Sequence, residues 1–435
     1  MKNVIPSLIL PVILALCGGS FRASAQDRVW TLSECLDYAM QNNIQLRQSR
    51  NNYLSGLEDT YQARAALFPS LSASASQNVS ATPFSSGNSA TYNGSYGVNS
   101  EMTLYSGGRL RTAIKQQEVQ NQIDSLSTLG SAMDVRISIV QAYMQALYAQ
   151  ESVRVSESTV EASRAQKDRA EQMWKAGSIS KVDFAQLESQ LYSDEYQVTV
   201  AKTNLENYLL QLKQLLELDI TEGIILSSID AEEEDILRLI PSKETVYGNA
   251  LANMPEVASS ELAVTAAELS DKQARSAYLP TVGLSAGVGT SNRSGTGNSF
   301  ISQIGDNISA NMGLTVSIPI FSNRRNKTAV NKARIALDNS KLSALSTQKA
   351  VLKEVETAYL DALSAQAQYT AATQKEKYAQ QSFELTDEQF SLGMKNTVEL
   401  ITAKNELLSA RLSRLQSKYM ALLNLHILDV YQGFE

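Results

Sequence analysis

Two short glycine turns constrain this chain more than any other feature. The segments 176–184 and 392–400 each interrupt a long helical pattern at a glycine, and these glycines, Gly177 and Gly393, stand 216 positions apart. An acidic residue follows each glycine by six positions, Asp183 in the first segment and Glu399 in the second. Glycine readily adopts the left-handed backbone that ends a helix. We therefore predict two helical-hairpin tips in a duplicated protein, and we expect its function there.

The duplication extends through most of the chain, which makes it the first pattern to interpret. Segment 63–69 corresponds to 274–280, and each ends in a proline; Tyr105-Ser106 corresponds to Phe321-Ser322. We predict a first repeat over 26–218, a linker over 219–241 and a second repeat over 242–435. Each repeat is expected to hold a helix, two strands and a long helical hairpin.

The N-terminal segment has the pattern of a secretory signal peptide over residues 1–25. Lys2 precedes an apolar run over 5–17, and 23–25 form a small-residue cleavage site, so we place cleavage before Gln26. Bulky Leu16 stands where a lipoprotein site has a small residue, which argues against lipidation of Cys17. The mature chain is therefore expected to leave the cytoplasm.

Each half is predicted to open with one helix that ends before a proline, Pro69 or Pro280. Two alternating stretches follow, at 71–79 and 92–104 in the first half and at 282–288 and 308–318 in the second. Runs of about ten residues match a tilted membrane strand. Segments 82–91 and 290–307 are rich in Gly, Ser and Asn and predict solvated loops.

A long helix then leads to each tip. From Ile123 to Leu147 apolar residues recur at steps of three or four, close to a coiled-coil repeat. About 70 residues at 1.5 Å each would give a helix of roughly 105 Å. Return helices are expected over 180–218 and 397–425. The acidic run 232–235 in the linker is predicted to be a solvated surface.

Composition excludes several classes of function. The chain has one histidine, His426, and only Cys35 remains after cleavage. Zinc sites built on Cys and His and His-dependent nucleophilic catalysis therefore lack their residues. The formal net charge of −7 disfavours nucleic acid as a partner. We predict no enzyme, no cofactor and no metal site.

The predicted elements do not fit a single compact domain. No segment of the mature chain approaches the ~18 consecutive apolar residues of a membrane-spanning helix. Four strands are too few to close a membrane barrel, and an open sheet edge is not tolerated in lipid. Both difficulties disappear if several chains share one barrel, although composition does not fix their number.

In this arrangement the sequence resembles the TolC-like outer-membrane efflux proteins. The resemblance rests on the duplicated helix–proline–strand pattern, on Tyr105-Ser106 and Phe321-Ser322 before the long helices, and on the paired tips. It implies a mainly α-helical protein whose long antiparallel hairpins form a tunnel, with four strands per chain in a 12-stranded barrel of a homotrimer. It also implies an outer-membrane location extending into the periplasm, contact with outer-membrane lipid, and docking to a periplasmic adaptor (membrane fusion) protein and an inner-membrane transporter.

The resemblance also assigns residues to a gate that closes the tunnel at the tips. Glu399 occupies the position of an acid that narrows the entrance, whereas Thr402 departs from the usual second acid. Lys395 corresponds to a basic gate link, with Asp183 as its expected partner. Phe390 replaces a frequent tyrosine. Gly177, Ser178, Gly393 and Met394 are expected to contact the adaptor.

Other interpretations remain open from the sequence. Asp183 and Glu399 also fit solvated first-turn acids favoured by the helix dipole, and Lys395 fits a surface lysine. A periplasmic coiled-coil adaptor or scaffold without a pore would explain the helices but not the four strands. A secreted hydrolase lacks a clustered acid pair outside the linker. The exported substrate, whether drug, metal or protein, is not determined.

Overall fold

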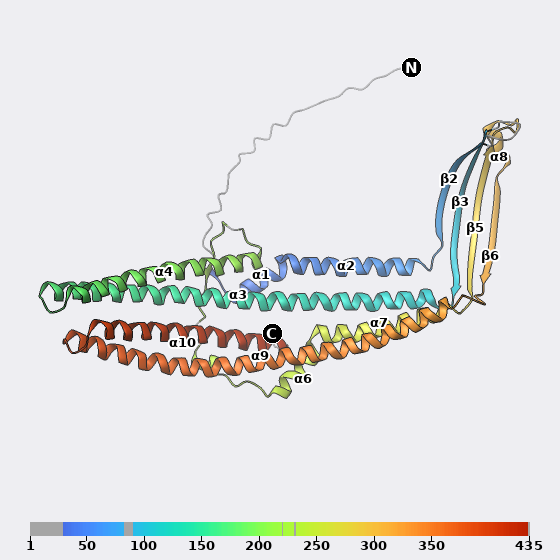
Figure 1. Ribbon diagram of the computed structural model, residues 1–435. Helices are drawn as coiled ribbons and strands as arrows, with labels where there is room; N and C mark the ends of the chain where they lie inside the picture. The colour runs from blue at the N-terminus through green and yellow to red at the C-terminus, as the bar shows by residue number, and fades with distance from the viewer. Residues whose placement is uncertain (1–28, 82–89, 220, 230–231, 434–435) are drawn as a thin grey trace, which may run out of the picture.

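The computed structural model describes residues 29–81, 90–219, 221–229 and 232–433. The predicted signal peptide, Cys17 and most of the 82–91 loop lie outside these residues. The molecule is elongated: two long helical hairpins lie side by side, with their tips at one end and a four-stranded sheet at the other (Figure 1). The predicted class, mainly helical with long antiparallel hairpins and four strands, is confirmed.

The same succession of elements occurs twice. In the first half it comprises α1 (Leu32–Asn42), α2 (Ile44–Ala65), β2 (Ser70–Ala81), β3 (Ala90–Ser106), α3 (Arg109–Lys175) and α4 (Lys181–Leu216). In the second half it comprises α6 (Lys243–Asn253), α7 (Pro255–Ser276), β5 (Thr281–Arg293), β6 (Ser309–Ser317), α9 (Arg325–Ser391) and α10 (Thr397–Gln432). Corresponding helices have equal lengths of 11, 22, 67 and 36 residues. At 1.5 Å per residue, α3 and α9 are each about 100 Å long.

The prediction of one opening helix per half is wrong, because each is divided in two. Asn43 leaves the helical conformation, and its side-chain oxygen accepts a hydrogen bond from the Leu46 amide at the start of α2. In the second half Pro255 begins α7. Proline suits this first position because an amide hydrogen there would have no partner within the helix. Each break is therefore set by the residue that starts the second helix. The spacing of apolar residues did not show that a helix ends there.

The linker fastens the two halves near the middle of α3. It contains β4 (Ile225–Leu226) and α5 (Glu233–Ile236), and β4 pairs in parallel with β1 (Val29–Trp30). The Tyr143 hydroxyl of α3 donates to the carbonyl oxygens of Trp30 and Ser227, at 3.1 and 2.8 Å. Burial raises the pKa of the Tyr143 hydroxyl, which stays a neutral donor. The acidic run 232–235 is exposed, as predicted.

The main core lies along the helices. Val140, Met144 and Leu147 of α3 are buried at the predicted spacing, together with residues of α1, α4, α9 and α10. Leu129, from the same apolar pattern, is 54% exposed in the single chain. Within the described part of the chain, no helix is both long enough and apolar enough to cross a membrane.

The sheet has the order β2-β3-β5-β6, and all its strands are antiparallel. Among the described residues, β2 and β6 each pair on one side only, so both outer edges are open. The predicted loop over 290–307 is partly wrong: β5 continues to Arg293, and α8 (Phe300–Asp306) follows. The Ser299 hydroxyl caps α8 by accepting from the Ser302 amide, a signal that the Gly/Ser/Asn composition concealed.

Candidate functional site at the hairpin tips

The first tip is a tight turn between α3 and α4. The Gly177 amide donates to the Trp174 carbonyl at 2.9 Å, and the Ser178 amide donates to the Met173 carbonyl at 2.8 Å. These bonds satisfy the last carbonyls of α3 and require a left-handed residue between them. Gly177 supplies it with φ +78°, and an added Cβ would meet no atom within 4 Å. The backbone conformation alone therefore demands glycine.

Asp183, in the first turn of α4, takes part in capping the start of that helix. The Ser180 hydroxyl donates to the Asp183 carboxylate at 2.7 Å, and the Asp183 amide donates back to the Ser180 oxygen at 3.1 Å. The Thr397 hydroxyl of the second tip faces this carboxylate. The hydroxyls of Ser180 and Thr397 hold the Asp183 pKa below its usual range. Asp183 is thus a capping residue that also faces the second tip.

The second tip repeats this backbone between α9 and α10. Gly393 has φ +72°, and the Met394 amide donates to the Gln389 carbonyl at 2.9 Å. Asn396 caps α10: its side-chain oxygen accepts from the Glu399 amide at 2.9 Å. The Glu399 carboxylate in turn accepts from the Asn396 amide at 3.1 Å. Glu399 therefore has the same structural position as Asp183.

The two tips differ in the cation beside the acid. Lys395 donates to the Glu399 carboxylate, and both side chains are partly exposed. This bond, followed by the bond from the Asn396 amide, lowers the Glu399 pKa. The predicted Lys395–Asp183 link is not made within the chain, where each residue has another partner. Thr402 lies one turn beyond Glu399 on α10 and is exposed.

A small core holds the tips together. Ala170, Leu187, Phe390 and Leu400 are buried against one another, which brings α3, α4, α9 and α10 into a single cluster. Trp174 lies outside this cluster, stacked on the Phe184 ring with centroids 5.4 Å apart. The absence of a hydroxyl at Phe390 suits this packing, because the side chain is 5% exposed.

A buried ion pair behind the tips was not predicted from the sequence. Lys404 of α10 donates to the carboxylate of Asp194 on α4 and to the hydroxyl of Ser163 on α3. All three side chains are at least 95% buried. Lys404 lies among apolar residues at helical spacing, including Leu400 and Leu407. The sequence did contain a signal for this pair. Lys404 on α10 and Asp194 on α4 are opposite charges, and each stands at a position that the apolar pattern of its helix assigns to the core.

The four residues predicted to contact an adaptor lie at the outermost turn of each hairpin. Gly177, Ser178 and Gly393 are exposed, and Met394 is 70% exposed. Exposed apolar side chains surround them in the single chain: Val182, Leu392 and Val398. The geometry thus presents a mixed apolar and polar surface at the far end of the helices from the sheet.

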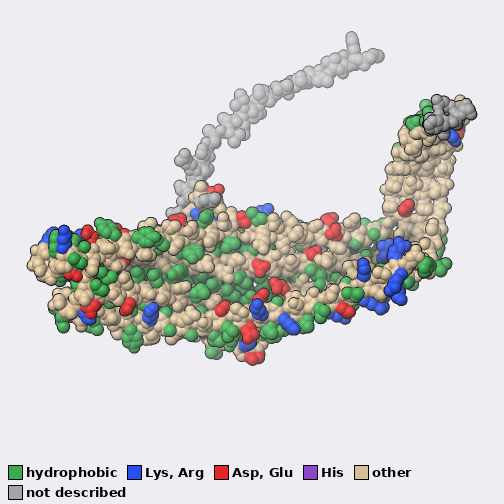
Figure 2. All heavy atoms as spheres, viewed as in Figure 1, with side chains coloured by type: hydrophobic (Ala, Val, Ile, Leu, Met, Phe, Trp, Pro, Cys, Tyr) green, Lys and Arg blue, Asp and Glu red, His purple; other side chains and the backbone are tan. Residues whose placement is uncertain are grey.

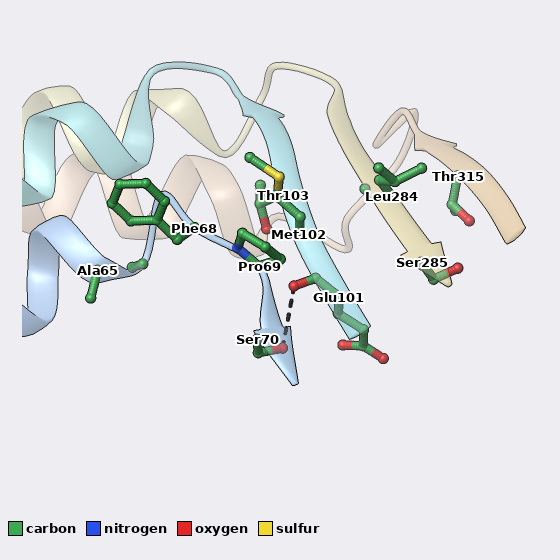
Figure 3. Close-up of a pocket in the computed structure, with 12 residues that line it drawn as sticks. Ala65, Phe68, Pro69, Ser70, Glu101, Met102, Thr103, Leu284, Ser285 and Thr315 are labelled. Carbon is green, nitrogen blue, oxygen red and sulfur yellow. Dashed lines mark hydrogen bonds between the residues drawn. The ribbon is translucent and has the colours of Figure 1, made fainter. Parts of the chain in front are cut away.

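The opposite end of the helices has a different character. A groove of about 580 Å³ lies where α2 passes into β2. Phe68, Met102 and Leu284 line it, and the Ser70 hydroxyl donates to the Glu101 carbonyl at 3.2 Å across its floor (Figure 3). The polar side chains in its lining are Ser70, Glu101, Thr103, Ser285 and Thr315, so the groove has a mixed polar and apolar character.

Comparisons with known proteins agree with this geometry. The model of the family described as "Outer membrane efflux protein" matches residues 35–217 and 246–431. The chain is 22% identical to the outer membrane efflux protein BepC of Brucella suis, over 89% of this chain and 82% of the relative. It is 23% identical to the outer membrane protein TolC of Escherichia coli, over 96% and 84%. The CmeC outer membrane channel of Campylobacter jejuni has the same fold, with a TM-score of 0.79 and 21% identity over 93% of this chain and 85% of that one.

Proposed function

This chain belongs to the outer membrane efflux protein family, and on that premise we propose that three copies form the outer-membrane duct of a tripartite efflux or type I secretion system. The observation that carries the proposal is the separation of two functional ends. Helices of 67 residues place a sheet with two open edges far from a pair of packed hairpin tips (Figure 1). The alternative of an adaptor or scaffold without a pore receives no support from the family match.

The open edges of the sheet favour the shared barrel. An unpaired strand edge in lipid leaves backbone groups without hydrogen-bond partners. The β6 edge of one copy can pair with the β2 edge of the next, so that three copies supply 12 strands. The strands would then lie in the outer membrane, and the helices would enclose a tunnel that extends into the periplasm.

The tips are the proposed gate. Three copies of Glu399 at a narrow mouth would concentrate negative potential, which favours cations and permits block by divalent ions. Lys395 balances one carboxylate per copy, and Thr402 adds no second acid. Asp183 contributes the contact between the two tips of a copy. Opening would follow docking of an adaptor and transporter, with Gly177, Ser178, Gly393 and Met394 as the contact points.

Single-channel conductance in planar bilayers tests the gate. Lys395→Glu places two acids beside each other, and Asp183→Lys replaces the acid that faces Thr397 with a cation, so each should increase the conductance of the closed channel. Glu399→Ala should weaken block by divalent cations added from the periplasmic side. Lys202→Glu, on the α4 surface, is the control and should match the unaltered protein. Unchanged conductance in both tip variants would exclude Lys395 and Asp183 from the gate, and undiminished block would exclude Glu399 from the mouth.

In vivo photocrosslinking tests the partners. A crosslinker at Met394 should capture a periplasmic adaptor, whereas one at Met420, exposed on the middle of α10, should not. Equal capture at both positions would contradict docking at the tips.

A further inference from the structure

Basic residues collect where the helices meet the sheet. The four segments that flank the strands, 60–68, 107–115, 272–280 and 322–334, contain eleven of the 38 Lys and Arg residues and none of the 45 Asp and Glu residues. They belong to the end of α2, the start of α3, the end of α7 and the start of α9, which converge at this junction (Figure 1). Figure 2 shows the blue side chains gathered there.

Most of these cations are unpaired within the residues that the structure describes. All eleven are exposed, and only Arg64, Arg275 and Arg334 have a carboxylate partner among the described residues. The others have none within those residues: Arg109, Arg111, Lys115, Lys272, Arg324, Arg325, Lys327 and Lys332. At the tips, by contrast, Lys167, Lys175 and Lys395 all bind an acid. The junction therefore presents positive charge that the chain itself does not neutralise.

One of these arginines, at the start of α9, has a strained backbone conformation. Arg324 has φ +64°, a conformation that non-glycine residues rarely adopt. Its counterpart before α3 is Gly108, with φ +82°. The second half thus keeps the same turn with an arginine, although glycine would relieve the strain. Strained positions of this kind cluster at functional sites.

An exposed apolar band separates these cations from the strands. Phe68 is 71%, Phe321 84% and Ile320 95% exposed in the single chain. Leu67, Tyr105, Tyr278 and Leu279 complete the band and are also exposed. Aromatic side chains followed by long basic ones mark the boundary between hydrocarbon and headgroups, where Lys and Arg extend their charges to the polar side.

We propose that this junction, a basic belt under an apolar band, binds the headgroups of anionic phospholipids on the periplasmic face of the outer membrane. The inference rests on the proposed function, which places the strands in that membrane. Arg109 and Arg111 follow the end of β3 at Ser106, and Arg324 and Arg325 follow the end of β6 at Ser317. Each such cation near an anionic lipid surface changes binding about fivefold. The phosphate oxygens accept hydrogen bonds from the arginines, and the apolar band contacts the acyl chains.

Lipid binding to the full-length trimer in detergent tests the belt. The probes are fluorescent phosphatidylglycerol and phosphatidylcholine in mixed micelles at 0.1 M salt. The unaltered protein should retain phosphatidylglycerol preferentially, and 1 M salt should abolish the preference. Replacing Arg109, Arg111, Arg324 and Arg325 by Gln should weaken phosphatidylglycerol binding at least tenfold and leave phosphatidylcholine binding unchanged. The two-residue variant Arg324→Gln with Arg325→Gln gives a smaller loss if the larger change prevents assembly.

The matched control removes four exposed cations from the middle of the same helix α9: Lys349, Lys353, Lys375 and Lys377. This variant should bind lipid as the unaltered protein does. An equal loss in both variants, or unchanged phosphatidylglycerol binding in the arginine variant, would overturn the proposal. Competition by millimolar inorganic phosphate would also overturn it, because the site would then recognise free phosphate.

Conductance in planar bilayers of phosphatidylcholine separates this proposal from the proposed function. The arginine variant should conduct like the unaltered protein, with the same ion selectivity. A change in ion selectivity together with intact lipid binding would place the arginines in the lumen and contradict the belt. Failure of the unaltered protein to conduct would instead contradict the duct itself.

Discussion

The two hairpin tips share a backbone and differ in how their acids are held. Gly177 and Gly393 end the long helices with the same left-handed turn, and Asp183 and Glu399 both complete a capping box. Asp183 is held by the neutral hydroxyls of Ser180 and Thr397, whereas Glu399 is paired with Lys395. Duplication has thus kept the geometry, which backbone sterics dictate, while the charge balance has diverged. The acid of the second tip is paired with a cation of its own tip, whereas the acid of the first tip is held by hydroxyls.

The largest expected effect concerns the ion pair that ties both hairpins together behind the tips. Lys404→Met leaves the buried Asp194 carboxylate without a cation, which should lower the free energy of unfolding by about 3–5 kcal/mol. Adding Asp194→Leu should recover most of this loss, because neither charge then remains buried. Denaturant titration followed by Trp174 fluorescence at the first tip measures the change.

The control for this prediction is an exposed pair that joins α4 to α3. Lys202 binds Glu157 at 2.8 Å with both side chains about half exposed, so Lys202→Met should cost less than about 1 kcal/mol. Equal effects of the Lys202 and Lys404 substitutions would show that burial does not distinguish these pairs.

A smaller effect is expected from the tip glycines, and it should be equal at both tips. Alanine at Gly177 or Gly393 must adopt a positive φ without any steric clash from neighbours, at a cost of about 1–2 kcal/mol. Gly130→Ala, inside α3 with open space around it, should instead stabilise the helix by up to about 1 kcal/mol. Denaturant titration of the three variants checks this. A different loss of stability in the Gly177 and Gly393 variants would show that the two turns are not structurally equivalent.

The smallest effects concern the response of the two tips to pH and salt. The pKa of Asp183 is lowered from 3.8 and that of Glu399 from 4.5, so both acids stabilise the folded tips above these values. Their contribution should be constant from pH 7 to 5 and disappear as pH falls below about 4, through the folded pKa values. Hydrogen exchange of peptides spanning 176–184 and 392–400 reports both tips.

Salt at pH 7 separates the two mechanisms in the same exchange experiment. One molar salt should loosen the second tip, where Lys395 and Glu399 are screened, and leave the first tip unchanged. Lys395→Gln should remove the salt dependence. A first tip as sensitive as the second would mean that a cation also holds Asp183.

Much of the fold was predictable because it depends on local rules. A left-handed turn between two helices admits few residues other than Gly177 and Gly393, and an acid three positions after Ser180 or Asn396 is within reach of the cap. The breaks at Asn43 and Pro255 were missed because the apolar pattern continues through them. The helix α8 was missed because its Ser299 cap lies in a composition typical of loops.

By itself, the sequence determined the duplicated succession of elements, the tips and the family, since each depends on residues near one another in the chain. The tertiary structure alone decided which partners the charged side chains take. Lys404 and Asp194 lie 210 positions apart, and only the packing of α10 against α3 and α4 brings them together. The same packing places Thr397 against Asp183. Helix geometry fixes contacts three or four residues apart, whereas contacts between hairpins depend on how whole helices lie against each other.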